Sequence, residues 1–228
     1  MKTIVALVVE GEKMTDDYEQ VLEDVLQNLR SYSSENFMIN YVDLLTSVSD
    51  APVEFHLAAS LFVLSTMTAQ RFAFASAVDS PLFTEKDDDT LKGRKLNLWF
   101  LIFGKSRITR KTSALMKKID EIMTELDIHK VTKVWSAPHL ITQLSKMKEN
   151  NSVHAVWVLD ECSLFFSLIS KNNTYLAEAE ATLSTLYDGD DYTSGTQARG
   201  SEFVPKPNFC VLLASTENLP SKFKKDAF

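Results

Sequence analysis

The sequence has few cysteines and no evident metal-binding motif. Only Cys162 and Cys210 occur among 228 residues, and each adjoins an apolar run that we expect to form a strand. We therefore expect two buried thiols in a reducing compartment. His56 lies in an apolar helical segment with no acidic or cysteine partner at ligand spacing, so we expect it to serve packing or lie at the surface rather than bind metal. No metal cluster of cysteines and histidines is visible in the sequence.

The chain also lacks a surplus of positive charge and a long hydrophobic run. It has 24 Lys and Arg against 31 Asp and Glu, a formal net charge of −7. This argues against a broad basic coat for nucleic acid but leaves room for a local basic site. Residues 2–9 are too short an apolar stretch for a signal peptide and lack a cleavage site, and residues 55–69 are too short and polar to span a bilayer. We expect a cytoplasmic protein with no membrane partner.

What the sequence has is enough apolar material for a full core, with 45% hydrophobic residues. Its first third reads as helices. An apolar stripe runs from Tyr18 to Leu29 behind the predicted cap Thr15, a second covers residues 37–48, and Pro52 opens a third helix that continues to about Gln70. We assign residues 1–80 to an N-terminal helical region.

Residues 81–228 read as alternating strands and helices. The predicted strands are residues 98–103, 130–135, 153–159 and 209–214, and residues 71–77, just before this region, read as one more strand. The predicted helices are residues 111–126, 139–148, 164–169 and 174–187; residues 81–95 read as a polar connector and 192–207 as a loop or hairpin. Asp87, Asp88 and Asp89 fit a solvated loop better than a cation site. Strands that are apolar throughout and alternate with helices imply an α/β fold with a mainly parallel sheet covered on both faces.

The stretch after residue 103 has the layout of a phosphate-binding loop. An apolar strand ends at Gly104, and a helix opens on Lys111 and Thr112. Such a loop needs backbone N–H groups at a helix N-terminus for phosphate oxygens, a lysine for the β- and γ-phosphates, and a hydroxyl for Mg²⁺. The intervening residues are Lys105, Ser106, Arg107, Ile108, Thr109 and Arg110, and Ser113 follows.

The loop departs from the usual pattern G-x-x-x-x-G-K-[ST]. Gly104 stands seven positions before Lys111 instead of six, and Arg110 occupies the place of the second glycine. Because a side chain restricts backbone conformations that glycine allows, the loop must differ locally. A plain strand, basic turn and helix is the alternative interpretation.

Two further strand ends offer polar groups. Asp160 and Glu161 follow an apolar strand, as the acids of the Mg²⁺-binding strand do in P-loop ATPases, although a strand leading into a capped helix has the same pattern. Ser215 and Thr216 end the last strand. In open α/β sheets ligands bind at the carboxyl edge, so either could sense a γ-phosphate, and a helix N-cap is the alternative for both.

Taken in order, these segments resemble the P-loop ATPase domain of a family of phage-, plasmid- and virus-associated primase-helicase-like replication proteins, related to RecA-like and helicase ATPases. The likeness runs from about Asn36 to Glu217 and includes the lead-in from Ala51, the loop Gly104–Thr112, Ser136–Leu140, Val158–Glu161, Leu186–Gly189 and Asn208–Thr216. The resemblance implies a three-layer P-loop NTPase that follows an N-terminal helical layer.

The resemblance also implies roles for individual residues. Lys111 would contact the phosphates of ATP, Thr112 and Asp160 would hold Mg²⁺, Glu161 would be the catalytic carboxylate, and Ser215 or Thr216 would be the sensor. It implies a homo-oligomer that acts on nucleic acid, DNA in preference to RNA, during replication of a mobile element. With the net acidity, DNA contacts are expected in an oligomer pore, near Arg199 and Lys206, or outside this chain; an ordinary connection is the alternative for that loop.

In the related ATPases the sensor strand lies between the phosphate-loop strand and the Asp-Glu strand, and a fifth strand and an arginine finger follow it. Neither is evident before Phe228. A bare apolar edge at residues 98–103 would promote aggregation, so we expect residues 4–9, a partner chain or further polypeptide to cover it. Two rival functions are a nucleotide-binding scaffold or switch with little turnover and a small-molecule kinase, which the lack of an evident lid and acceptor site disfavours.

Overall fold

The computed structural model describes residues 4–8, 16–32, 36–68, 72–74, 83–85, 94–95, 97–104, 115–149, 152–170, 178–196 and 200–216. The helices are α1 (Asp16–Tyr32), α2 (Phe37–Val48), α3 (Val53–Thr68), α4 (Lys117–Glu125), α5 (Ala137–Lys146), α6 (Ser163–Ser170) and α7 (Ala179–Asp188). The strands are β1 (Ile4–Val8), β2 (Phe72–Phe74), β3 (Phe83–Glu85), β4 (Arg94–Lys95), β5 (Trp99–Phe103), β6 (His129–Lys130), β7 (Lys148–Glu149), β8 (Ser152–Leu159), β9 (Tyr192–Thr196), β10 (Gly200–Val204) and β11 (Pro207–Ser215).

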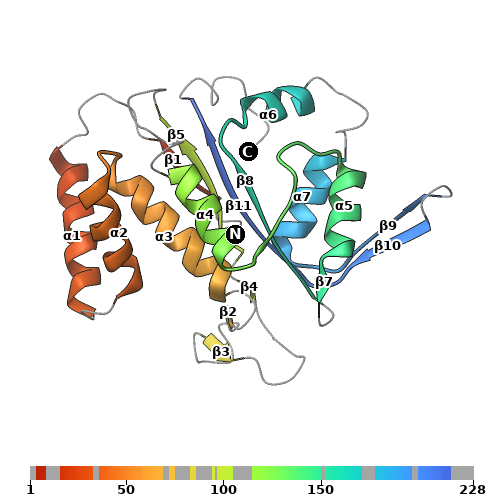
Figure 1. The fold of residues 1–228 in the computed structure, drawn as a ribbon, viewed down its shortest axis with the longest axis horizontal. Coiled ribbons are helices and arrows are strands. Elements are labelled where there is room, and N and C mark those ends of the chain that lie inside the picture. The colour runs from red at the N-terminus through yellow and green to blue at the C-terminus, as the bar shows by residue number, and fades with distance from the viewer. Residues whose placement is uncertain are drawn as a thin grey trace.

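The central sheet is mainly parallel, as predicted. Its order is β1-β5-β11-β8-β6, with all four of these pairings parallel and the short β7 antiparallel to β8. Every residue of β11 is buried, which is typical of a central strand covered on both faces. The expected position of the last strand, between the strand that ends at Phe103 and the strand that precedes Asp160, is confirmed (Figure 1).

The outer side of β5 is covered, as expected, by the segment near the N-terminus. β1 pairs with β5 in parallel, from Ile4 opposite Trp99 to Val8 opposite Phe103. The apolar strand β5 therefore lies inside the sheet, and β1 takes the edge. This pairing is one of the covers that the sequence predicted for that strand.

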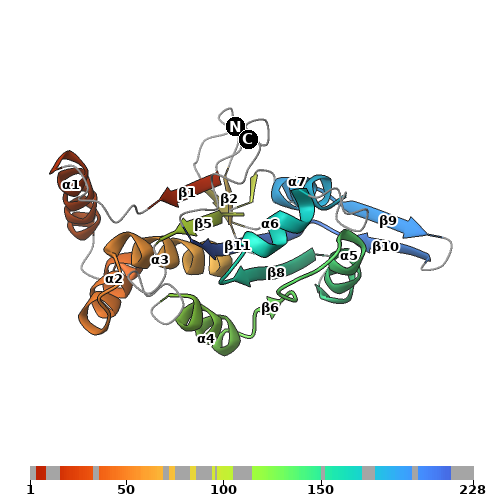
Figure 2. The same cartoon turned by 90° about the horizontal axis from the view of Figure 1, so that it is seen from above.

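Side chains alternate between the two faces of the sheet and form two cores. One core joins Leu101, Trp157 and Leu213 to residues of α5, α6 and α7. The other joins Phe100, Ile102 and their neighbours on β11 to residues of α2, α3 and α4. Seen from above, α3 and α4 lie on one side of the parallel strands and α6 and α7 on the other (Figure 2).

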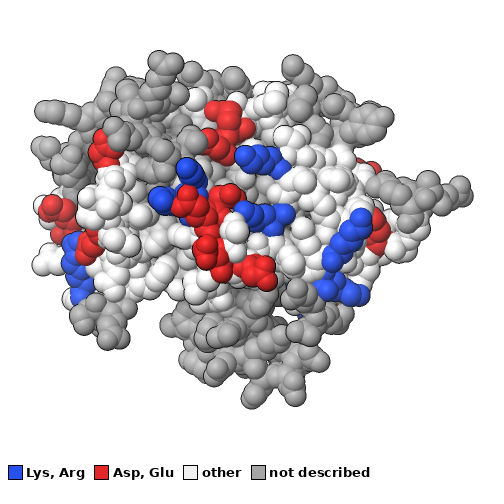
Figure 3. All heavy atoms as spheres, viewed as in Figure 1, with Lys and Arg blue, Asp and Glu red and all other residues white. Residues whose placement is uncertain are grey.

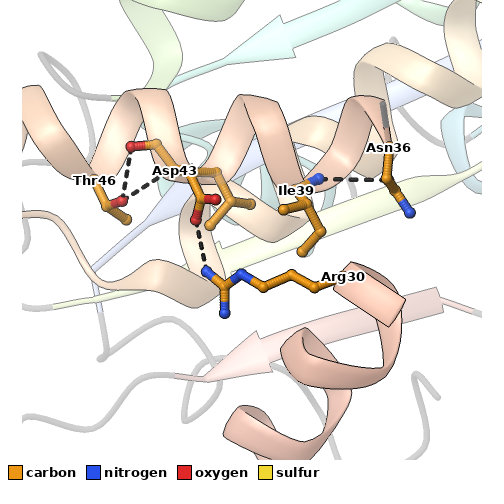
Figure 4. A network of polar contacts seen from close by, with 6 residues as sticks. Arg30, Asn36, Ile39, Asp43 and Thr46 are labelled. Atoms are coloured by element: carbon orange, nitrogen blue, oxygen red, sulfur yellow. Dashed lines mark hydrogen bonds and ion pairs between the residues drawn. The ribbon is translucent and has the colours of Figure 1, made fainter. Parts of the chain in front are cut away.

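The first three helices form where the apolar stripes predicted them. Asn36 caps α2, because its Oδ1 accepts hydrogen bonds from the backbone N–H groups of Met38 at 3.0 Å and Ile39 at 3.5 Å. Arg30 of α1 donates to Asp43 of α2 at 2.7 Å in an exposed ion pair, which adds little stability (Figure 4).

No helix in the described ranges is both long enough and apolar enough to cross a membrane.

Two segments differ from the sequence prediction. The connector predicted at residues 81–95 contains β3 and β4, which both pair antiparallel with β2 in a separate small sheet. The strand predicted at residues 130–135 is reduced to β6, whose last residue is Lys130. Beyond it Trp135 is buried in the core, whereas Val134 is 54% exposed.

The segment after α7 is a hairpin, one of the two forms that the sequence allowed. α7 ends at Asp188 and is followed by Gly189, whose φ of 73° is the left-handed conformation that glycine adopts at little cost. β9 and β10 then pair antiparallel and project away from the main sheet (Figure 1). The hairpin is fixed to α5 by a 2.7 Å hydrogen bond from Thr142 Oγ1 to Glu202 Oε1.

Candidate functional site at the carboxyl edge of the sheet

Three neighbouring parallel strands end side by side at one edge of the sheet. The register pairs Ser215 of β11 with Phe103 of β5, and Leu213 of β11 with Leu159 of β8. Gly104 directly follows β5, and Asp160 and Glu161 directly follow β8. The topology therefore brings the predicted start of the phosphate loop, the predicted sensor and the predicted acidic pair to one edge, where open parallel sheets bind ligands.

Hydrogen bonds connect the three strand ends through Ser215. The backbone N–H of Gly104 donates to the carbonyl oxygen of Ser215 at 3.3 Å, and the Ser215 hydroxyl donates to Glu161 Oε1 at 2.7 Å. Next to them the N–H of Cys162 donates to the carbonyl oxygen of Ala214 at 3.0 Å. Ser215 is fully buried, whereas Glu161 is exposed, so a buried residue holds an exposed carboxylate.

Glu161 also caps the helix that follows it. The backbone N–H of Ser163, the first residue of α6, donates to Glu161 Oε1 at 3.1 Å. A carboxylate at this place satisfies a free N–H group and interacts favourably with the positive end of the helix dipole. The capped-helix interpretation of the acidic pair is therefore confirmed for Glu161. A catalytic role for the same side chain stays a prediction.

Three buried aromatic side chains, Trp135, Trp157 and Phe165, pack against one another in the core next to the acidic pair. Trp157 lies three residues before Asp160, and Phe165 lies four residues after Glu161. These two rings are 4.8 Å apart between centroids, and Trp135 packs against both at 5.0 and 4.8 Å. The cluster fixes both the end of β8 and the start of α6, because close-packed rings permit little movement.

The structure describes only part of the predicted site. Gly104, Asp160, Glu161, Ser215 and Thr216 are described and come together at the sheet edge. The rest of the predicted loop lies outside the described residues: Lys105, Ser106, Arg107, Ile108, Thr109, Arg110, Lys111, Thr112 and Ser113. The expected convergence of the Lys111 ammonium with the acidic pair is therefore still a prediction.

Asp160 is the described residue at this edge that was predicted to hold Mg²⁺. No group of three or more His, Cys, Asp or Glu that could hold a metal occurs among the described residues. Mg²⁺ usually keeps several waters and binds one or two carboxylates together with substrate phosphates. A half-buried Asp160 at a strand end fits that mode, with Thr112 as the predicted second ligand.

His56 lies in the core beneath α3. Its side chain is fully buried on α3, and neither ring nitrogen has a hydrogen-bond partner in the described part of the chain. Burial lowers the pKa of His56, because the charged imidazolium is disfavoured away from water. The expected packing role agrees with this burial.

Charges on the described surface are mixed rather than uniformly basic. On the face seen in Figure 3, lysines and acids of α4 and β6 lie next to one another. Lys118 pairs with Glu121 at 2.9 Å, and Lys130 pairs with Asp120 at 2.9 Å. Such interspersed charge offers no broad attraction for a phosphate backbone on this face.

The residues proposed for DNA contact are divided between described and undescribed positions. Arg199 lies outside the described residues. Lys206 is exposed just beyond β10, and its backbone N–H donates to Asp191 Oδ1 at 2.8 Å, which closes the base of the hairpin. This contact is the kind found in an ordinary connection, and the Lys206 side chain remains a candidate for phosphate contact.

The main feature that sequence reasoning missed is the contact between two residues it had named separately. Ser215 was expected to face a γ-phosphate or cap a helix, and its hydroxyl instead meets Glu161. The polar residue at the tip of a central strand was the only available signal.

Comparisons of the chain with protein-family models, with curated proteins and with solved structures find no match.

Proposed function

We propose that this chain is a P-loop NTPase module that binds ATP with Mg²⁺ and hydrolyses it to drive helicase-like remodelling of nucleic acid. The observation that supports this most is the strand order β5-β11-β8, with Ser215 linking Gly104 to Glu161 at the carboxyl edge. The resemblance stated above implies that order for a three-layer P-loop fold. The context proposed is replication of a mobile element in the cytoplasm, through a homo-oligomer that binds DNA.

In this proposal each residue has a defined task. Backbone N–H groups of the loop that follows Gly104, residues 105–113, and the Lys111 ammonium would hold the phosphates, and Thr112 with Asp160 would hold the metal. Mg²⁺ would offset negative charge on the phosphates and orient them. Glu161 orients a water and takes its proton, a role that suits an exposed carboxylate fixed at a strand end.

Substitution of Lys111 tests nucleotide binding. Lys111→Ala should weaken ATP binding roughly 10- to 100-fold, the effect of losing a charge-assisted contact of about 1.5–3 kcal/mol. The matched control is Lys118→Ala, which removes an exposed lysine paired with Glu121 on α4. Equal affinities of the two variants in a calorimetric titration with ATP and Mg²⁺ would end the phosphate-loop assignment.

Substitution of Glu161 tests hydrolysis. Glu161→Gln keeps the size of the side chain and an acceptor oxygen for α6, and it should retain ATP binding while turnover falls about 10²- to 10⁴-fold. Glu180→Gln, at an exposed position on α7, is the control for loss of one acid. Stimulation of wild-type turnover by single-stranded DNA would favour the helicase-like function over a kinase.

A nucleotide-binding scaffold or switch with little hydrolysis is the second candidate. The observation that favours it is the use of Glu161 Oε1 for two structural contacts, with Ser215 and with the N–H of Ser163. In that case wild type and Glu161→Gln would bind ATP alike and neither would release phosphate above background.

A further inference from the structure

We propose that Ser215 is a positioning residue for Glu161, and that Thr216 rather than Ser215 is the polar group at this strand end that is available to a bound nucleotide. This inference rests on the proposed function, because it assigns the two candidate sensor residues different tasks in the same site. A serine hydroxyl has one proton to donate. In Ser215 that proton goes to Glu161 Oε1 at 2.7 Å.

Burial separates the two candidates. Ser215 has no exposed surface and its side chain is enclosed at the junction of β11 and β8, whereas Thr216, the next residue, is partly exposed. Successive side chains of an extended chain point in opposite directions, so both cannot face the same partner. With Ser215 directed to Glu161, a direct contact with phosphate falls to Thr216.

The contact also fixes the direction of the carboxylate. A glutamate side chain has several rotatable bonds, and an exposed one samples many rotamers. Here one oxygen, Oε1, accepts from the Ser215 hydroxyl at 2.7 Å and from the Ser163 N–H at 3.1 Å. Two donors on different elements, β11 and α6, hold the carboxylate at the edge in the way that a supporting contact orients a reacting group.

Ser215 is also joined to β5, the strand that leads to the predicted phosphate loop. The carbonyl oxygen of Ser215 accepts from Gly104 N–H at 3.3 Å, so its main chain is tied to the end of β5 while its hydroxyl is tied to Glu161. Removing the hydroxyl should leave the main-chain link and release only the carboxylate. The predicted consequence is slower chemistry with unchanged nucleotide binding.

The test is steady-state ATP hydrolysis by the full chain, with Mg²⁺, for wild type, Ser215→Ala and Ser215→Thr. Ser215→Ala should lower kcat about tenfold or more while KM and the affinity for ATP stay within about twofold. Ser215→Thr keeps a hydroxyl on the same carbon and should recover most of kcat. In the Glu161→Gln background, Ser215→Ala should cause no further loss, because the group that it positions is already disabled.

Ser65→Ala is the matched control for loss of a buried hydroxyl beside β11. Ser65 Oγ lies 3.3 Å from Cys210 Sγ, five residues before Ser215 along the strand and away from the carboxyl edge. If Ser65→Ala lowers kcat as much as Ser215→Ala, or if Ser215→Ala weakens ATP binding instead of turnover, the positioning role is wrong and the proposed function stands. If wild type binds no ATP, the proposed function and the positioning role are both wrong.

Folding is monitored separately so that the comparison stays decisive. Unfolding midpoints of Ser215→Ala and Ser65→Ala are measured by denaturant titration, since each variant loses the hydroxyl of a buried serine and one hydrogen bond. Should Ser215→Ala fail to fold, Ser215→Cys, which is similar in size and a weak donor, replaces it with the same expected loss of kcat. A kcat of Ser215→Cys equal to that of wild type would contradict the proposal.

Discussion

The two faces of the central sheet are packed by different means. On the α5–α7 face, Trp135, Trp157 and Phe165 interlock as large rings. On the α2–α4 face, α3 buries the rings of Phe55 and Phe62 together with small side chains such as Ala58 and Ala59. Large rings fill volume and fix orientation, whereas small side chains let a helix backbone approach closely.

The second face also encloses titratable groups. Burial lowers the pKa of His56 on α3 and raises the pKa of Tyr41 on α2 to about 12. It also raises the pKa of the Cys210 thiol, which lies in the same core. The aromatic face therefore supports the acidic pair by shape, while stability of the α3 face depends on pH. Four predictions, in order of decreasing effect, test this difference.

Removal of the central ring should have the largest effect. Trp157→Ala empties the middle of the aromatic cluster and should reduce the free energy of unfolding by about 3–5 kcal/mol. Trp157→Phe keeps a ring but loses the 3.1 Å hydrogen bond from Trp157 Nε1 to the Lys133 carbonyl, so we expect a loss of about 1–2 kcal/mol. Denaturant unfolding measures both, and a loss under about 1 kcal/mol for Trp157→Ala would show that the cluster is not needed.

Overpacking should be the next largest effect, on the opposite face. Ala59→Leu inserts a larger side chain at a fully buried position of α3 and should cost about 1–3 kcal/mol. Leucine is a good helix former, so helix propensity cannot explain a loss of that size. The control Ala181→Leu makes the same change at an exposed position of α7 and should have little effect on the unfolding midpoint.

His56 should make stability fall on the acid side of neutrality. Because burial lowers its pKa in the folded chain, the unfolded state binds the proton first, near pH 6.5. The stability that neutral His56 contributes is present above that pH and is lost as pH falls through it, by at most about 1.4 kcal/mol per pH unit.

His56→Leu should flatten this acid-side loss in unfolding experiments between about pH 7 and 5. It should also stabilise the fold slightly at pH 7, since neither ring nitrogen of His56 has a described hydrogen-bond partner. His139→Leu removes an exposed imidazole at the start of α5 and is the control. A pH profile of His56→Leu identical to that of wild type would refute the assignment of the loss to His56.

The smallest effects should distinguish two tyrosines on the two faces. Tyr41 Oη is buried with no partner among the described residues, so Tyr41→Phe should leave stability unchanged or raise it by up to about 1 kcal/mol. It should also remove the loss of stability expected as pH rises from about 10 towards 12, where unfolded Tyr41 ionises first.

The comparison residue is Tyr192 on the aromatic face. Its hydroxyl lies 3.4 Å from Thr182 Oγ1, which belongs to a fully buried residue. Tyr192→Phe should therefore cost about 0.5–1 kcal/mol, because it leaves Thr182 without this contact. If both tyrosine substitutions change the unfolding midpoint in the same direction, the difference between the two faces does not extend to their hydroxyl groups.

The sequence predicted the elements that have strong local patterns. The apolar runs that became β5, β8 and β11 and the stripes that became α1, α2 and α3 were predicted with bounds close to those observed. Burial on both faces leaves such strands apolar throughout, and one buried stripe gives a helix its period, so local composition suffices. The position of β11 between β5 and β8 was implied by the resemblance, not by these local patterns.

Features that depend on distant partners were not predictable. Trp135 was assigned to a strand over residues 130–135, but it packs against Trp157 and Phe165 instead. Residues 83–85 were assigned to a polar connector, and their pairing with the predicted strand at 72–74 was not foreseen. Likewise the serine and the glutamate at positions 215 and 161 are 54 residues apart in sequence, and only the register of β11 with β8 brings them into contact.

The chain order of the sheet has a consequence for synthesis on the ribosome. Since β11 follows β5 and β8 in the chain yet lies between them, neither has its inner neighbour until about residue 215 has been translated. Contacts of long sequence separation form slowly, and exposed strand edges invite association with other chains. In a nascent chain the inner edges of β5 and β8 should therefore stay unpaired until late in translation. During that period chaperones have the most surface to bind.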